Sequence, residues 1–255
     1  MLKIARSPAP RPNSVLKEVR RKPSEDNTAY VAAHASSAKQ ASHIVLLGGV
    51  GPLDFRLRAA QAHVRDDLAP SAWSHVLLLG APAKDPAKTV AYEIALYGRA
   101  GVGFPPATNG VAKTTLGEYR DPKLFPNIAV LEIPVAFAAV TEIIERFKHQ
   151  RSTVDALEHL LGWWSYVWGV GRTPNPLLDS LGIPAAIFAE YVFAAAGYDL
   201  VPGFPSRSSC PEAIWLSARW WFSMPRITDD ETEQGQSKHA INGAYDAQHY
   251  LVPVT

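Results

Sequence analysis

The stretch Trp73–Leu79, with the sequence WSHVLLL, constrains the fold of this chain more than any other. It is a short, continuous apolar run, preceded by Pro70 and closed by Gly80. This pattern is typical of a buried strand rather than of a helix. One histidine, His75, stands near its start. A histidine in that position is either a hydrogen-bonded core residue or a working base, and its neighbours in the fold decide between the two.

Three further strands are indicated around this one. Residues 41–47 form an apolar run that stops at a glycine-rich turn, and residues 89–96 and 128–133 have a similar short apolar character. Glu93 lies inside the run at 89–96. A carboxylate inside an apolar strand needs a polar partner. An imidazole from a neighbouring strand, such as that of His75, would supply one.

Helices are indicated between and after these strands. Apolar residues at positions 53, 57, 60 and 64 recur every three or four residues, which predicts a helix over residues 53–68. Further helices are predicted at residues 135–150, 153–168, 187–197 and 215–222.

This order of elements resembles the circularly permuted branch of the NlpC/P60 papain-like superfamily, which includes the YiiX-type proteins. In that branch, a strand and a helix precede a strand that carries a Ser-His pair. A glutamate-bearing strand follows, and a nucleophilic cysteine comes last, at the start of a helix. The resemblance covers roughly residues 41–220, and it rests on the order and spacing of the whole set. The matching segments are Ser42–Pro52, Trp73–Leu79, Tyr92-Glu93, Gly110-Val111 with Leu116 and Tyr119, and Ile128–Ile133.

The resemblance and the pattern of elements together predict an α+β fold. We expect a small, mainly antiparallel sheet from residues 41–135, flanked by helices from residues 136–222. The resemblance implies a permuted papain-like arrangement of these elements. It also implies that His75 is the general base of a cysteine hydrolase or acyltransferase, and that Glu93 orients its ring.

The chain departs from the family pattern at the nucleophile. The helix that best matches the family's cysteine helix spans residues 187–197, and in that register Phe188 occupies the cysteine position. The small residue after it is Ala189. Neither side chain can attack a carbonyl group. Together with Trp73 and Ser74, these two residues are expected to lie at the degenerate cleft.

Cys210 is the only cysteine of the chain, and it directly precedes Pro211, which suits the first position of a helix. A helix N-terminus favours a thiolate, so Cys210 is a candidate for a displaced nucleophile. Equally, Ser209 or Cys210 caps the helix, with Glu212 in its first turn. The resemblance favours the capping interpretation, because it puts the nucleophile on the previous helix.

Two functions from different classes follow. Thiol acyl transfer needs a thiolate, an imidazole and a group that orients the imidazole. Without a cysteine at position 188, the chain is expected to be a catalytically degenerate binding or scaffold protein. The alternative is an active thiol amidase or esterase, acting on a peptidoglycan peptide or a lipid, that uses Cys210 with His75 and Glu93. A third possibility is an unrelated α+β protein.

Composition narrows the classes of partner. The chain has 255 residues, is 47% hydrophobic and carries a net charge of +1, which argues against a nucleic-acid surface. A single cysteine excludes an internal disulfide. The glycines at 48–51 lack the spacing and the lysine of a phosphate loop, and no histidine pair has metal-ligand spacing. We therefore expect no cofactor and no metal, but a small amide- or ester-containing ligand or a peptide.

Three regions are expected along the chain. Residues 1–40 form a basic, proline-containing, flexible arm that could contact a protein or an anionic surface. Residues 41–225 form the permuted papain-like domain, and residues 226–255 a polar tail. The arm lacks the apolar centre of a secretory signal, which favours a cytoplasmic location. The longest apolar stretch, residues 181–198, is interrupted by a proline and a glutamate, so we expect a buried helix and no transmembrane segment.

Overall fold

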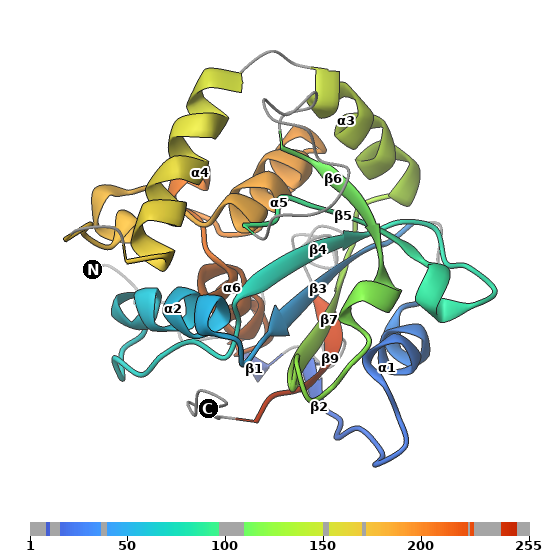
Figure 1. The fold of residues 1–255 in the computed structure, drawn as a ribbon. Helices are drawn as coiled ribbons and strands as arrows, with labels where there is room; N and C mark the ends of the chain where they lie inside the picture. Colours follow the sequence, from blue (N-terminus) through green and yellow to red (C-terminus); the bar gives the residue numbers. More distant parts are fainter. Residues whose placement is uncertain are drawn as a thin grey trace, which may run out of the picture.

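The computed structural model describes residues 9–10, 16–36, 40–96, 110–149, 153–169, 172–223, 225–226 and 241–248. Within these ranges, a seven-stranded sheet and six α-helices make an α+β fold, as the sequence predicted (Figure 1). Within the predicted N-terminal arm, residues 1–8, 11–15 and 37–39 lie outside the described residues.

The strand order in the sheet is β2-β9-β7-β3-β4-β5-β6. Five of the neighbouring pairs are antiparallel, and the β2–β9 pair is parallel, so the sheet is mixed. It is also larger than the sheet expected from residues 41–135, because β2 and β9 come from outside that range. The strands are β2 (Leu16–Glu18), β3 (Ser42–Gly48), β4 (His75–Leu79), β5 (Val90–Glu93), β6 (Ala112–Thr115), β7 (Asn127–Ile133) and β9 (Asn242–Asp246).

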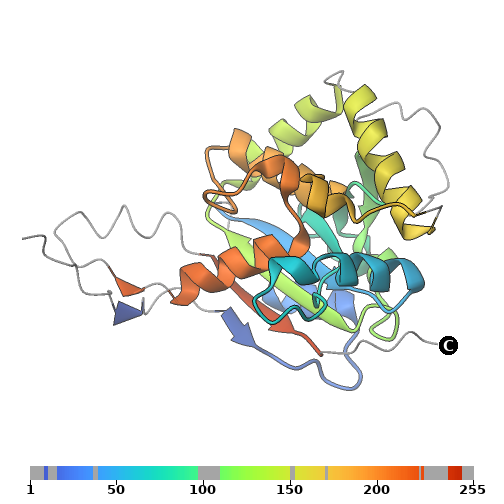
Figure 2. The same ribbon diagram turned by 90° about the vertical axis from the view of Figure 1, so that its left-hand side faces the viewer.

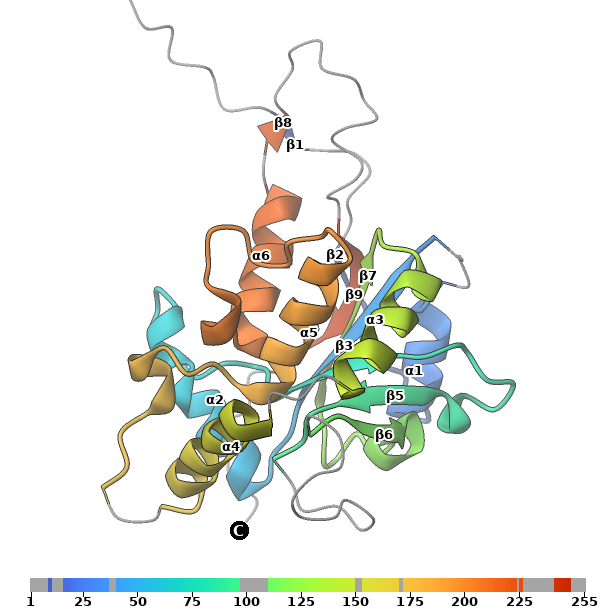
Figure 3. The same cartoon turned by 90° about the horizontal axis from the view of Figure 1, so that it is seen from above.

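Helices cover both faces of the sheet. Figure 3 shows α5 and α6 on one side of β3 and β4, and α1 on the other. Because side chains alternate along a strand, each central strand contributes residues to two separate hydrophobic cores, one on each face of the sheet. We call the face under α3, α5 and α6 the α5 face, and the face under α1 the α1 face. The helices are α1 (Asn27–His34), α2 (Pro52–Ala60), α3 (Phe137–His149), α4 (Thr153–Val167), α5 (Pro184–Ala195) and α6 (Pro211–Ser223).

The central strands β3 and β4 coincide with two of the predicted apolar runs. Every residue of β3 and β4 is buried, which explains why these strands lack an alternation of polar and apolar residues. Close approach of the chain also explains the glycine that ends β3. A Cβ atom at Gly48 would lie 1.8 Å from the carbonyl oxygen of Ala72, so no larger residue fits there.

Short elements connect the main ones. The helix expected over residues 53–68 is α2 followed by a separate 3-10 turn at Ala62–Val64. A two-stranded pair, β1 (Ala9–Pro10) with β8 (Pro225–Arg226), lies apart from the main sheet (Figure 2). The remaining 3-10 turns are Pro86–Lys88, Leu116–Tyr119, Pro176–Asp179 and Ser206–Ser208.

Two segments that the sequence assigned to the flexible arm and the polar tail belong to the fold. Residues 16–36 contribute β2 and α1, and residues 241–248 contain β9, which is hydrogen-bonded between β7 and β2. Asp26 caps α1 by accepting from the Ala29 amide, and Tyr30 is fully buried against the sheet. The domain boundaries at residues 40 and 226 therefore do not describe these parts of the chain.

One stretch of the described chain, Pro176–Ala195, is apolar and long enough to cross a membrane by length and composition alone. It includes α5, and most of it is buried within the fold. Such burial is typical of the core helix of a globular domain.

Candidate functional site

His75, Glu93 and Tyr119 form a compact group of polar side chains, which we call the His75 cluster. His75 Nε2 lies in hydrogen-bonding contact with Glu93 Oε2, and the Tyr119 hydroxyl donates to the same oxygen. The His75 and Tyr119 rings stack with their centroids 5.7 Å apart. The antiparallel pairing of β4 with β5 brings the first two residues together, and the 3-10 turn after β6 supplies the third.

The His75 cluster lies inside the protein. The side chain of Glu93 has no exposed surface, and His75 and Tyr119 are almost fully buried. Glu93 Oε2 accepts hydrogen bonds from two protein side chains, so the cluster is held together inside the core. None of the three residues lines either of the two hollows described below, so the cluster has no substrate space at those hollows.

The sole thiol lies on the other side of the sheet. His75 pairs directly with Leu47 of β3, whose side chain packs on the α1 face, so His75 points to that face. Cys210 belongs to the core of the α5 face. The sheet therefore separates the two side chains, and the structure does not bring them together.

Cys210 is the N-cap of α6. Its sulfur accepts from the backbone amides of Glu212 and Ala213, but the thiol is fully buried. Burial dominates over these hydrogen bonds and raises the pKa of Cys210 to about 12. A thiol with this pKa is a poor nucleophile at neutral pH.

Phe188 and Ala189 are also on the α5 face. Both are buried in its core, where Phe188 packs against Phe147 of α3 with ring centroids 5.5 Å apart. A cleft shared by Phe188 and His75 would require the two side chains to face each other. They lie on opposite faces of the sheet, so they do not share a cleft. The phenylalanine fills a helix–helix contact rather than a space beside the imidazole.

Trp73 and Ser74 join helices to the start of β4. The indole of Trp73 packs edge-on against Trp215 of α6, with centroids 5.1 Å apart. The Ser74 hydroxyl donates to Asp54 of α2 at 2.6 Å and accepts from the Gly49 amide at 3.1 Å. These contacts give both residues a structural role.

A buried polar network occupies the N-terminus of α6. Glu212 accepts from the Ser71 hydroxyl at 2.6 Å and from Arg65 at 2.9 Å, while its own amide donates to Gln61 at 2.8 Å. The sequence placed Glu212 in the first helical turn but gave no sign of these partners, which are about 140 to 150 residues away. Because these groups occupy the helix end, it is not free to bind an anion.

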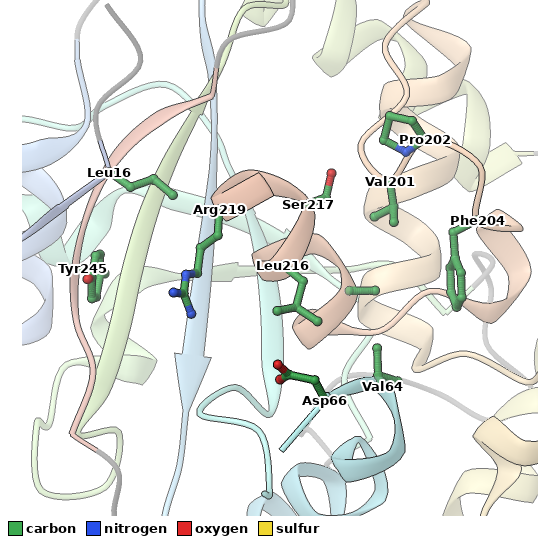
Figure 4. A pocket seen from close by; sticks show the side chains of 11 residues that line it. Leu16, Val64, Asp66, Val201, Pro202, Phe204, Leu216, Ser217, Arg219 and Tyr245 are labelled. Carbon is green, nitrogen blue, oxygen red and sulfur yellow. The ribbon is translucent and has the colours of Figure 1, made fainter. Parts of the chain in front are cut away.

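A groove of about 860 Å³, which we call the α6 groove, runs along the outer side of α6 (Figure 4). Leu216 lies in its middle, with Tyr245 of β9 at one end and Phe204 at the other. Arg219 and Asp66 also line it, and neither makes an ion pair with another described residue. The groove therefore combines an apolar lining with two unpaired charges of opposite sign.

A second hollow, of about 500 Å³, opens on the α1 face beside His43, and we call it the His43 pocket. It is lined by the end of α1, the start of β3 and the loop that follows β4. The sequence analysis did not single it out.

Among the described residues, no three histidine, cysteine, aspartate or glutamate side chains gather in a way that could hold a metal ion. Comparisons of the chain with protein-family models, with curated proteins and with solved structures find no match.

Proposed function

We propose that this chain is a non-hydrolytic binding protein built on a permuted papain-like arrangement. The observation that carries the proposal is the position of the sole thiol. Cys210 caps a helix in the α5-face core, whereas His75 points to the α1 face. A base and a nucleophile on opposite faces of one sheet cannot exchange a proton, so the thiol route to an acyl-enzyme is closed.

The His75 cluster then has a structural role. Its three side chains contact one another inside the α1-face core and join β4, β5 and the turn after β6. Hydrogen bonds to protein side chains within the core account for a buried histidine–carboxylate pair without a substrate. This supports retention of the pair in a protein without turnover.

The α6 groove is the surface that best supports binding. Its apolar lining favours desolvation of an apolar ligand, and Arg219 and Asp66 supply charges that a ligand can match. A peptide or a small amide- or ester-containing molecule carries both kinds of group. The ligand class proposed for the α6 groove is therefore the one that the resemblance implies for the family's substrates.

A turnover experiment tests the absence of hydrolysis. The intact protein, Cys210→Ala and His75→Ala are assayed with p-nitrophenyl acetate and with an alanine p-nitroanilide, which report ester and amide cleavage. We expect all three proteins to match the buffer rate. The opposite result would be cleavage by the intact protein and none by either variant, with both variants folded by circular dichroism. In that case the function would be that of a thiol hydrolase.

Binding at the α6 groove is tested separately with the apolar anionic dye 8-anilinonaphthalene-1-sulfonate. Leu216→Asp puts a charge into the middle of the groove and should strongly reduce dye fluorescence. The matched control is Leu178→Asp, because Leu178 is an exposed leucine outside the groove. Equal fluorescence of the two variants, both with the intact protein's melting temperature, would refute the groove as a binding surface.

A further inference from the structure

The His43 pocket has the size and shape of a small-molecule site. Its volume of about 500 Å³ lies within the range of ligand pockets, and small side chains make up much of its wall. Ala32 and Ala35 come from α1, Ala41 from the segment before β3, and Ala83 from the loop after β4. Figure 1 shows that this loop passes beside α1, and residues from both segments line the pocket.

His43 contributes a polar ring to the wall of the pocket. The side chain is about nine-tenths buried, and its Nε2 atom accepts a hydrogen bond from the Ser36 amide at 3.1 Å. Since a neutral imidazole carries one proton, the proton of this ring is on Nδ1. Glu132 Oε2 lies 3.5 Å from Nε2, and it can accept from that atom only in a form of the ring that carries a proton on Nε2.

The Nδ1–H group of His43 is available to a ligand. It makes no hydrogen bond with any described residue, and it is not among the side-chain atoms sealed from solvent. Burial lowers the pKa of His43, which favours the neutral ring and this arrangement of its proton. A donor in an apolar wall is strongly selective for an acceptor, because leaving it unpaired costs free energy.

Charge in the pocket favours an anion. Lys84 lines the same pocket, is exposed to solvent and forms no ion pair within the described chain. No aspartate or glutamate is among the lining residues. A carboxylate would accept from His43 and be attracted by the Lys84 ammonium group, whereas a cation would be repelled by that group.

We propose that the His43 pocket binds a small carboxylic acid with a compact apolar body. Its carboxylate accepts from His43 Nδ1–H and faces Lys84, and its apolar part packs on the alanine-rich wall. The site is separate from the α6 groove and from the His75 cluster. The proposal for the His43 pocket is therefore independent of the proposed function.

The first test compares benzoate and cyclohexanecarboxylate with their neutral amides, benzamide and cyclohexanecarboxamide. Binding to the full chain is followed by the ¹³C-methyl resonances of Ala32, Ala35 and Leu79, which line the pocket. We expect saturable shifts with both acids and roughly tenfold weaker binding of the amides, because a charge-assisted hydrogen bond is lost. Absence of these shifts, or equal affinities of acid and amide, would overturn the proposal.

Two substitutions at position 43 separate the two ring nitrogens. His43→Gln puts its amide near the place of Nε2, so it keeps an acceptor for Ser36 and loses the donor in the pocket. His43→Asn keeps a donor near the place of Nδ1 and loses the acceptor. We expect the preference for acid over amide to vanish in the first variant and to persist in the second. The reverse result, with both variants folded, would rule out Nδ1 as the recognition group.

Lys84→Gln supplies the charge test, and Lys123→Gln is the matched control, since Lys123 is an exposed lysine outside the pocket. The first substitution should weaken benzoate binding severalfold and leave benzamide binding unchanged, while the second should change neither. An equal effect of both substitutions would show only a general attraction of anions to the protein.

Discussion

Removal of the imidazole of His75 should destabilise the protein, because it takes a hydrogen-bond donor from a buried carboxylate. In His75→Ala, Glu93 keeps the Tyr119 hydroxyl and loses the ring nitrogen. The side chain of Glu93 has no exposed surface, so water cannot replace the imidazole without opening the core.

The size of the effect follows from burial. Removing one partner of a buried ion pair costs about 3–5 kcal/mol. For a chain of this length, 1 kcal/mol shifts the melting temperature by about 2–4 °C, so the expected fall is about 6–20 °C. Tyr119→Phe removes one hydrogen bond to the same oxygen and should cost about 1.5–3 kcal/mol.

Urea unfolding at pH 7, followed by tryptophan fluorescence and by circular dichroism, measures these costs. The control is the triple variant His75→Leu, Glu93→Met and Tyr119→Phe, which removes every polar group of the His75 cluster at once. Replacing a buried pair by apolar residues is often neutral or stabilising, so this variant should unfold close to the intact protein.

A small effect of His75→Ala on stability would contradict the structural role of the His75 cluster. If His75→Ala unfolds within about 0.5 kcal/mol of the intact protein, as surface substitutions do, then Glu93 is hydrated and the His75 cluster is open to solvent. An open cluster would be a candidate active site, and the structural role proposed for it would be wrong.

Four further predictions concern the α5 face. Burial, with the negative charge of Asp199, raises the pKa of Glu190 from 4.5 to about 8. The folded state therefore holds this proton more tightly than the unfolded chain, and stability should fall as the pH rises from about 4.5 to 8. Glu190→Gln should flatten that slope in urea titrations, by a few kcal/mol in order of magnitude; an unchanged slope would contradict the raised pKa. Iodoacetamide should alkylate Cys210 at neutral pH only as fast as the protein opens, so addition of urea below the unfolding midpoint should accelerate the reaction; rapid labelling of the native protein would show an accessible thiol. Gly182→Ala should destabilise the protein by roughly 1–3 kcal/mol, because its Cβ atom would lie 2.3 Å from the carbonyl oxygen of Ser209; a melting temperature equal to that of the intact protein would contradict this close approach. Phe188→Cys should not create p-nitrophenyl acetate hydrolysis, because its thiol would lie on the face opposite His75; new activity that depends on His75 would show that the two faces communicate.

The strongly patterned segments of the chain could be predicted from sequence. The strands β3, β4 and β7 and the helices α3, α4 and α5 fall where continuous apolar runs or helical spacing indicated them. The neighbourhood of His75 and Glu93 follows from two adjacent apolar strands that each carry one polar residue. Tyr119 lies in a segment on which the family resemblance rests, but nothing in the sequence indicates that its hydroxyl reaches a buried carboxylate.

The strands at the margin of the sheet could not be predicted, because their stability comes from distant partners. β9 has the sequence NGAYD, which is poor in strand-forming residues. It is nevertheless ordered between β7 and β2, which lie more than 100 residues away in the chain. The same is true of the His43 pocket, whose walls come from segments on three sides that share no local pattern.

The face to which a buried side chain points is the feature on which a functional interpretation of this chain depends. A continuous apolar strand such as β4 has no polar alternation, so its sequence does not say which residues face which helix. The register with β3 decides it: His75 pairs with Leu47, and Leu47 packs under α1. A one-residue shift of that register would turn His75 toward α5, where the family pattern puts the nucleophile. The order of motifs along the chain is the same in both registers, so motif order alone cannot distinguish a catalytic histidine from one that stabilises the opposite core.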